Sequence, residues 1–243
     1  GYNIPIHVDA ASGGFILPFL KPHVKWDFRL NNVLSISTSG HKYGLVYPGL
    51  GWVIWKDKKY LPSEMAFSVN YLGADITQVG LNFSRPAAQV LGQYYQFIRL
   101  GYQGYKAIQQ NSMEIAEYLH EEIGKMPQFK NYSSELVNPL FIWSLNPKYD
   151  KVANWTLYDL QYKLQQNGWM VPAYTLPKDL EQCVVMRIVC RQGFSRDMAD
   201  MLLTDIRMAV ADLEKLSYPT QSRVEANRNI HPKQSFNHGG KKN

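Results

Sequence analysis

Apolar residues in the first part of the chain gather in three short runs, each of which ends in small or polar residues. The runs cover residues 4–8, 33–37 and 51–55. Apolar runs of this length, bounded by turn-forming residues, are typical of strands buried within a sheet. We therefore expect three strands here, with Asp9 directly after the first and Ser39-Gly40 shortly after the second.

Helical spacing of apolar residues begins after the third run. Residues 87–100 carry this spacing, with Pro86 suited to the first turn and Gly101 to the helix end. A second helix is expected from about residue 104 to residue 124, before Pro127. The pattern thus predicts two consecutive helices that are separated near Gly101.

The pattern changes again beyond residue 130, where short apolar runs alternate with amphipathic stretches. Thr156 and Asp159 form a capping-box pattern for a helix that ends at Gly168, and Ser195 can cap a longer helix to about Leu216. The strands expected in this part cover residues 140–145, 169–171 and 183–190.

These elements divide the sequence into three parts. Residues 1–112 are expected to form part of a large, mostly parallel α/β sheet domain, and residues 113–216 a smaller α+β domain. Residues 217–243, in which basic residues outnumber acidic ones, are predicted to be a flexible tail.

Composition narrows the class of protein. The 243 residues are 45% apolar, which is enough for a sizeable core, and no apolar run is long enough to cross a membrane. Cys183 and Cys190 lie in one apolar run and are expected to be reduced core thiols, which favours the cytoplasm. The sequence starts without Met and runs at once into an apolar segment, so we expect it to begin inside a larger protein.

Candidate chemistry lies at the ends of the first two strands, where Asp9 and Lys42 occur. Pyridoxal phosphate requires a lysine amine for its covalent attachment and a carboxylate beside its pyridine nitrogen. Ser39 and His41 add groups that can bind a phosphate. The alternative is a solvated lysine in a surface loop and an aspartate that caps a turn, and the residues alone leave both interpretations open.

Longer motifs favour the first interpretation, because together they resemble bacterial-type glutamate decarboxylases, which belong to the group II pyridoxal-phosphate-dependent decarboxylases of fold type I. The resemblance extends to about Leu216 and matches the C-terminal half of that family. It rests on HVDAASGGF at 7–15, WDFR at 26–29, STSGHKYG at 37–44, GWVIW at 51–55, YLG at 71–73, NFSRP at 82–86, TLYDL at 156–160, GWMVP at 168–172 and MRI at 186–188.

The resemblance implies roles for residues near the two strand ends. Lys42 would hold the cofactor, and Asp9 would pair with its pyridine nitrogen. Ala11 would pack against the ring, while Ser39 and His41 would bind the phosphate. Lys42, Asp9 and His41 are the catalytic residues that this resemblance implies.

Further roles are implied at four other positions. Ser84 would reach the phosphate bound to a partner subunit, and Arg187 would bind a substrate carboxylate. Tyr71 would lie on a hairpin over the active site. His238, in SFNH at 235–238, resembles a histidine that closes the site as pH rises, although five residues follow it here.

The implied reaction converts L-glutamate to 4-aminobutanoate and carbon dioxide and consumes a proton, as in acid resistance. The implied assembly is a homo-oligomer, either a dimer or a hexamer-of-dimers type. The resemblance implies no metal and no nucleic acid, and no calmodulin is expected because no Trp follows Trp169. Two alternatives stay open: a decarboxylase of the same fold that acts on another amino acid, and a truncated chain without catalysis.

Overall fold

The computed structural model of the protein describes residues 4–71, 74–78 and 86–227. The chain forms two compact units, Gly1–Ser112 and Met113–Asn243, and each is described by itself. Helix α2 (Ala88–Gly124) contributes residues to both units.

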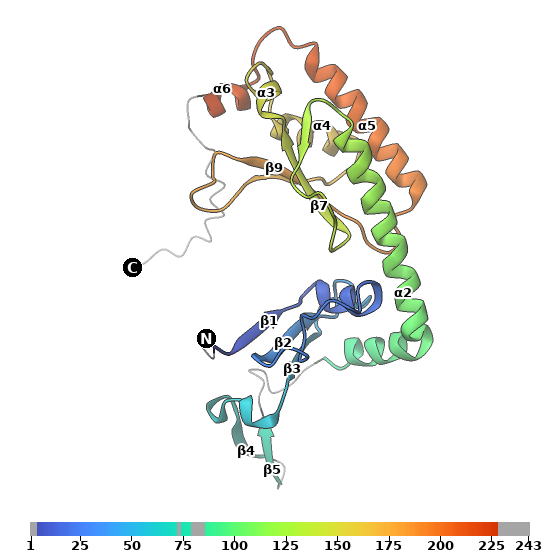
Figure 1. The fold of residues 1–243 in the computed structure, drawn as a ribbon, viewed down its shortest axis with the longest axis vertical. Helices are drawn as coiled ribbons and strands as arrows, with labels where there is room; N and C mark the ends of the chain where they lie inside the picture. Colours follow the sequence, from blue (N-terminus) through green and yellow to red (C-terminus); the bar gives the residue numbers. More distant parts are fainter. Residues whose placement is uncertain (1–3, 72–73, 79–85, 228–243) are drawn as a thin grey trace. The chain divides into compact units, whose positions relative to one another are not determined.

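The first unit is built on a three-stranded sheet of β1 (Ile6–Asp9), β2 (Val33–Ser39) and β3 (Gly51–Trp55), with β2 in the centre (Figure 1). Strand β1 runs parallel to β2, and β3 runs antiparallel to it. The three strands expected from the apolar runs are thus confirmed, and their bounds shift by at most two residues. The expected burial of the first strand is wrong, because β1 is mostly exposed.

Short elements connect these strands. A 3-10 turn (Gly13–Phe15) and helix α1 (Leu17–Leu20) follow β1, and two further 3-10 turns (Lys58–Tyr60 and Ser63–Met65) follow β3. A small apolar core supports the sheet, formed by Val8, Ala10, Trp26, Phe28, Val33 and Ile36. The antiparallel hairpin of β4 (Phe67–Tyr71) and β5 (Ala74–Gln78) comes next in the chain.

Helix α2 is interrupted at Gly101, whose φ of 54° and ψ of −165° lie outside the helical region. Glycine adopts a positive φ at little cost because it lacks a side chain. The break confirms the predicted end of a first helix at this residue, and Figure 1 shows the two helical stretches meeting at an angle.

The second unit contains a four-stranded antiparallel sheet in the order β6-β7-β9-β8. Two predicted strands are confirmed, since β7 covers Leu140–Leu145 and β9 covers Val184–Val189. Strand β6 (Phe129–Asn131) was not predicted because three residues give too short a pattern.

The strand predicted at residues 169–171 is wrong, because β8 instead covers Ala173–Thr175. Two features explain the shift. The Trp169 indole N–H donates to Asp205 Oδ2 at 2.6 Å, which ties Trp169 to helix α5 (Arg196–Glu214). Pro172 has no backbone N–H for a ladder, so that regular pairing starts after it.

The helices of this unit begin at the expected caps. Thr156 and Asp159 form the capping box of α4 (Leu157–Gln166), and the Ser195 side chain accepts the Met198 N–H at the start of α5. The short helix α3 (Pro147–Asp150) precedes α4. Large side chains with less than 2% exposure fill the core, among them Trp143, Trp155, Phe141, Leu157, Leu160, Leu164, Met186 and Leu203.

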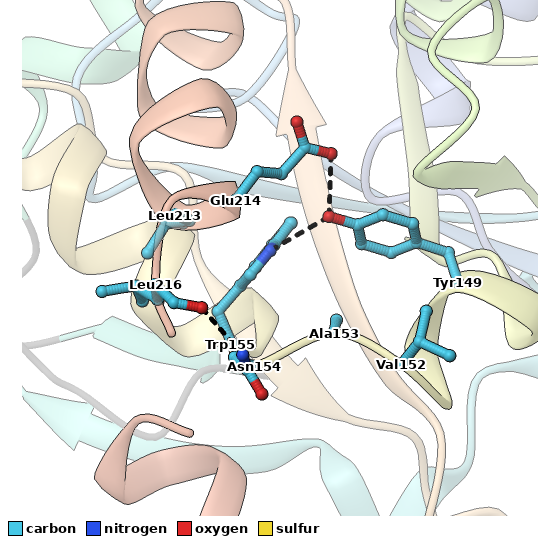
Figure 2. A pocket seen from close by; sticks show the side chains of 8 residues that line it. All are labelled: Tyr149, Val152, Ala153, Asn154, Trp155, Leu213, Glu214 and Leu216. Carbon is cyan, nitrogen blue, oxygen red and sulfur yellow. Dashed lines mark hydrogen bonds between the residues drawn. The ribbon is translucent and has the colours of Figure 1, made fainter. Parts of the chain in front are cut away.

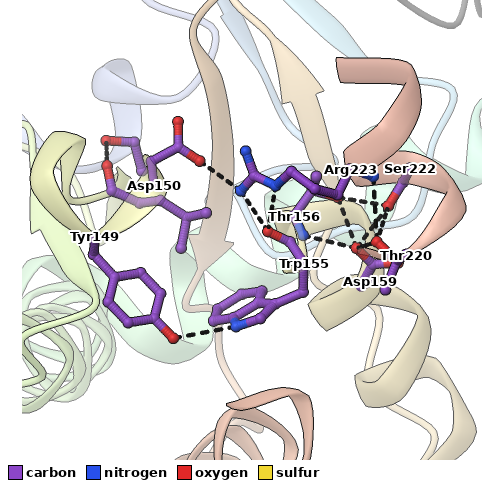
Figure 3. A network of polar contacts seen from close by, with 10 residues as sticks. Tyr149, Asp150, Trp155, Thr156, Asp159, Thr220, Ser222 and Arg223 are labelled. Atoms are coloured by element: carbon purple, nitrogen blue, oxygen red, sulfur yellow. Dashed lines mark hydrogen bonds and ion pairs between the residues drawn. The ribbon is translucent and has the colours of Figure 1, made fainter. Parts of the chain in front are cut away.

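The prediction of a flexible tail from residue 217 is wrong for the part of it that the structure describes. Helix α6 (Gln221–Asn227) follows α5, and its Arg223 side chain is buried (Figure 3). The guanidinium donates to the Trp155 carbonyl at 3.1 Å through Nε and forms an ion pair with Asp150 at 2.7 Å. The basic composition of this segment favoured an exposed chain, whereas the Arg223 side chain is hydrogen-bonded to residues far away in the sequence.

A carboxylate completes the attachment of this segment. Asp159 Oδ2 accepts the hydroxyls of Thr220 at 2.9 Å and Ser222 at 2.6 Å, in addition to the Thr156 N–H at 2.7 Å. The same group therefore caps α4 and anchors the turn before α6 (Figure 3).

No helix in the described residues is both long and apolar enough for a membrane crossing. Both cysteines are free thiols, as predicted, but only Cys190 lies in the core, since Cys183 is half-buried. Burial raises the pKa of Cys190 to about 12, which keeps this thiol protonated and unreactive near neutral pH.

Candidate active site

The candidate site begins where β1 and β2 end. Because the two strands are parallel neighbours, their carboxyl ends meet at one edge of the sheet. Asp9 is in register with Ser37, and the Ala10 N–H donates to the Ser37 carbonyl at 2.8 Å. The Ser39 N–H donates to the Ala11 carbonyl at 3.2 Å, which extends the pairing past the last residue of β1.

Asp9 is the last residue of β1, and its side chain is exposed. Its Oδ1 accepts the backbone N–H of Ala11 at 3.1 Å, which fixes the turn after the strand. Within the described residues Oδ2 has no hydrogen-bond partner, so this oxygen is available to a group placed at the sheet edge.

Lys42 lies three residues beyond the end of β2, in a turn that its own N–H closes on the Ser39 carbonyl at 3.4 Å. Its side chain is half-buried, and its ammonium forms no ion pair with any residue in the described ranges. His41 is exposed beside it, and Ser39 is half-buried. The turn thus carries an amine, an imidazole and a hydroxyl within four consecutive residues.

Hydrogen bonds between the His7 side chain and two serines of β2 join the two parallel strands, two residues before Asp9. His7 Nδ1 lies 2.7 Å from Ser35 Oγ, and His7 Nε2 lies 3.2 Å from Ser37 Oγ. The side chains of His7 and Asp9 share one face of β1, since residues two apart in a strand do so. These contacts were not predicted from the sequence, although the period-two spacing of these polar residues is a signal for them.

Two glutamine side chains of α2 form hydrogen bonds with the backbone of the segment after Lys42. The Gln93 amide donates to the Gly44 carbonyl at 2.8 Å, and the Gln109 amide donates to the Tyr43 carbonyl at 2.8 Å. Both glutamines lie on α2 and are completely buried. Neither glutamine was predicted from the sequence, because two glutamines in an amphipathic helix do not differ in pattern from surface residues.

The remaining predicted site residues lie elsewhere or outside the described residues. Arg187 is on β9 of the second unit, where it is exposed and its Cζ lies 5.7 Å from the Tyr174 ring centroid. Tyr71 is the last residue of β4, and nothing is described of its side chain. Ser84 and His238 lie outside the described residues.

A pocket of about 280 Å³ lies in the second unit, between the end of α5 and the segment after α3 (Figure 2). Its polar side chains already pair with one another: Tyr149 donates to Glu214 at 2.9 Å, and the Trp155 indole donates to Tyr149 at 3.2 Å. Burial and, to a smaller extent, the hydrogen bond to Glu214 raise the pKa of Tyr149 to about 12. None of the predicted site residues lines this pocket.

The groups at the sheet edge match what pyridoxal phosphate requires. This cofactor requires a carboxylate beside its pyridine nitrogen and an amine for its carbonyl carbon, and Asp9 and Lys42 are groups of these two kinds. Ser39 and His41 carry a hydroxyl and an imidazole, which are groups that can donate hydrogen bonds to a phosphate. These four residues therefore match the cofactor in their chemistry.

Comparisons with known proteins agree with this chemistry. Residues 1–145 match the family described as pyridoxal-dependent decarboxylase conserved domain. Glutamate decarboxylase beta of Listeria monocytogenes is 48% identical over 212 residues, which is 87% of this chain and 45% of that protein. The chain thus spans about half the length of the curated relatives it matches.

Solved structures support the fold. A glutamate decarboxylase from Lactobacillus brevis superposes with a TM-score of 0.79 at 48% identity, covering 87% of this chain and 48% of that one. A sphingosine-1-phosphate lyase from Burkholderia pseudomallei gives a TM-score of 0.72 at 21% identity, covering 93% of this chain and 48% of that one, which is a likeness of fold alone.

Proposed function

The chain belongs to the pyridoxal-dependent decarboxylase family, and from this premise we propose that it forms part of a glutamate decarboxylase that converts L-glutamate to 4-aminobutanoate and carbon dioxide. The fold of the chain is that of the fold type I pyridoxal phosphate enzymes. The observation that carries the proposal is the pair of neighbouring parallel strand ends, which bring Asp9 and Lys42 to one edge of a sheet in a chain 48% identical to glutamate decarboxylases.

In this proposal each residue at the sheet edge has a defined task. Lys42 holds the cofactor through its Nζ, and Asp9 keeps a proton on the pyridine nitrogen. Ser39 and His41 bind the phosphate, and Ala11 packs against the ring. When bound, pyridoxal phosphate supplies an electron-accepting ring for the pair released when a bond at the substrate Cα breaks.

Arg187 is proposed to bind a carboxylate of the substrate. A planar guanidinium can bind both oxygens of a carboxylate at once, and its exposure on β9 leaves it open to a ligand. Tyr71 is proposed to lie over the site and Ser84 to reach the phosphate held by a second subunit. These two roles rest on the resemblance of their motifs, as does the homo-oligomeric assembly.

The cellular setting belongs to the same proposal. Decarboxylation of glutamate consumes one proton per turnover, which suits a role in acid resistance. Cys183 and Cys190 as thiols support a reducing compartment, and we place the protein in the cytoplasm.

We also propose that His238 switches activity off as pH rises, when its imidazole is neutral. Removal of residues 235–243 should then extend the pH–activity curve upward, and an unchanged curve would exclude this role.

The reaction is tested by the formation of 4-aminobutanoate from L-glutamate in the presence of pyridoxal phosphate. We expect the protein in its natural length to form 4-aminobutanoate and carbon dioxide in equal amounts. The Lys42→Ala variant should form neither. Turnover of L-aspartate or an aromatic amino acid in place of L-glutamate would show a different substrate, and no turnover of any amino acid would refute a decarboxylase.

A further inference from the structure

Tyr105 connects the two segments that carry Asp9 and Lys42. Its side chain is only 1% exposed. Its ring centroid lies 5.9 Å from that of Phe15, in the 3-10 turn that follows the Asp9 turn. Its hydroxyl donates to the Gly44 carbonyl at 2.9 Å, two residues beyond Lys42. One side chain therefore contacts both the segment that follows Asp9 and the segment that follows Lys42.

Gln93 completes this contact. Its amide donates to the Gly44 carbonyl at 2.8 Å and to the Tyr105 hydroxyl at 2.9 Å. The Tyr105 oxygen can thus accept one hydrogen bond and donate another. Burial raises the pKa of Tyr105 to about 12, so that the hydroxyl keeps its proton near neutral pH.

The break in α2 brings these two residues to the same carbonyl. Gln93 precedes Gly101 in the chain, and Tyr105 follows it. An uninterrupted helix would carry residues twelve positions apart about 18 Å along its axis. The positive φ of Gly101 turns the helix, so that residues from both sides converge on the loop after β2.

The loop leaves no free space against this support. A Cβ on Gly44 would lie 2.6 Å from the Gly40 carbonyl oxygen and 2.9 Å from Gln93 Oε1. A Cβ on Gly40 would lie 2.8 Å from the same Gln93 oxygen. Both ends of the turn that contains Lys42 are therefore packed against the Gln93 amide.

We propose that Tyr105 and Gln93 are positioning residues, which fix the Lys42 loop relative to the Asp9 turn through the Gly44 carbonyl. The inference rests on the proposed function, because the distance between these two segments matters only if Asp9 and Lys42 bind the same ligand. A cofactor held by Lys42 at one end and Asp9 at the other requires both to stay in place within a fraction of an ångström.

The Tyr105→Phe variant tests this role, because it keeps the ring in its aromatic cluster and removes only the hydroxyl. Tyr102→Phe is the matched control: it lies on the same helix, is 49% exposed, and donates to the Pro18 carbonyl at 3.2 Å. The Gln93→Met variant removes the amide and serves as a second test of the same support.

The first measurement is amide hydrogen exchange of residues 40–46 in the cofactor-free protein. We expect exchange about ten-fold faster in Tyr105→Phe and Gln93→Met than in the unaltered protein, since each loses a buried hydrogen bond to the loop. Tyr102→Phe should show no change. Exchange in both test variants as slow as in the control would overturn the proposal.

The second measurement is the rate at which pyridoxal phosphate dissociates from the loaded protein, together with kcat and KM for L-glutamate. We expect about ten-fold faster dissociation and a lower kcat with little change in KM. Faster exchange without faster dissociation would overturn a positioning role and leave a purely structural one. Failure of every variant and of the unaltered protein to bind the cofactor would instead refute the proposed function, and hydrogen exchange would still decide whether Tyr105 fixes the loop.

Discussion

At the scale of single residues, Asp9 is the group whose charge the proposed chemistry requires. Its Oδ1 accepts the Ala11 N–H at 3.1 Å, and an asparagine oxygen can accept the same hydrogen bond. We therefore expect Asp9→Asn to keep the turn and the unfolding temperature of the unaltered protein. A neutral amide cannot hold a proton on the pyridine nitrogen, so kcat should fall on the order of 100-fold or more. A variant that binds cofactor and turns over normally would exclude Asp9 as the ring partner.

Arg187 is the residue for which geometry matters more than charge. If it binds a carboxylate with two parallel N–H groups, a lysine cannot replace it. We expect Arg187→Lys to lower kcat/KM about ten-fold or more, nearly as much as Arg187→Ala. Arg191→Lys, at another exposed arginine beyond the end of β9, should leave kcat/KM unchanged. Full activity of Arg187→Lys would show that any cation suffices there or that the substrate binds elsewhere.

Residues at strand ends could be predicted from the sequence, but their supports could not. Asp9 and Lys42 follow apolar runs and small residues, so that a strand pattern places them directly. Gln93 and Tyr105 donate to a backbone carbonyl that lies 49 and 61 positions away in the sequence, and nothing in the local pattern of a helix indicates such a partner.

At the scale of elements, the sequence predicted helix starts and ends correctly where they depend on residues close together in the chain. Gly101 was expected to end a helix and does interrupt α2, and the capping box at Thr156 starts α4. The position of strand β8 was predicted wrongly because the Trp169 side chain donates to Asp205. The spacing of apolar residues in the sequence gives no sign of this contact. Helix α6 was missed because its basic composition resembles a solvated tail.

Helix α6 supports a prediction of its own, because its attachment depends on Arg223. This side chain is 8% exposed and donates to both the Trp155 carbonyl and the Asp150 carboxylate. Replacing Arg223 by Met should lower the free energy of unfolding by about 1–3 kcal/mol, since the buried Trp155 carbonyl loses its partner. Urea unfolding measures this loss, with Arg191→Met as the exposed control. Equal midpoints for the two variants would contradict the proposed anchoring.

At the scale of the whole molecule, the chain spans about half the length of its curated relatives. Strands β1 and β3 form the two edges of the first sheet and expose apolar side chains, with Ile6 43%, Val53 57% and Ile54 46% exposed. Exposed apolar edges favour association with other chains. We expect the 243 residues expressed by themselves to self-associate and to release almost no carbon dioxide from L-glutamate. Sustained turnover by a monodisperse preparation would contradict this.

The most direct test of the account is the identity of the lysine that holds the cofactor. The protein in its natural length, saturated with pyridoxal phosphate, is reduced with borohydride, digested and mapped by mass spectrometry. We expect the pyridoxyl group on Lys42, in the peptide that also contains Ser39 and His41. A pyridoxyl group on any other lysine, with Lys42 unmodified, would contradict the assignment of the active site to the ends of β1 and β2.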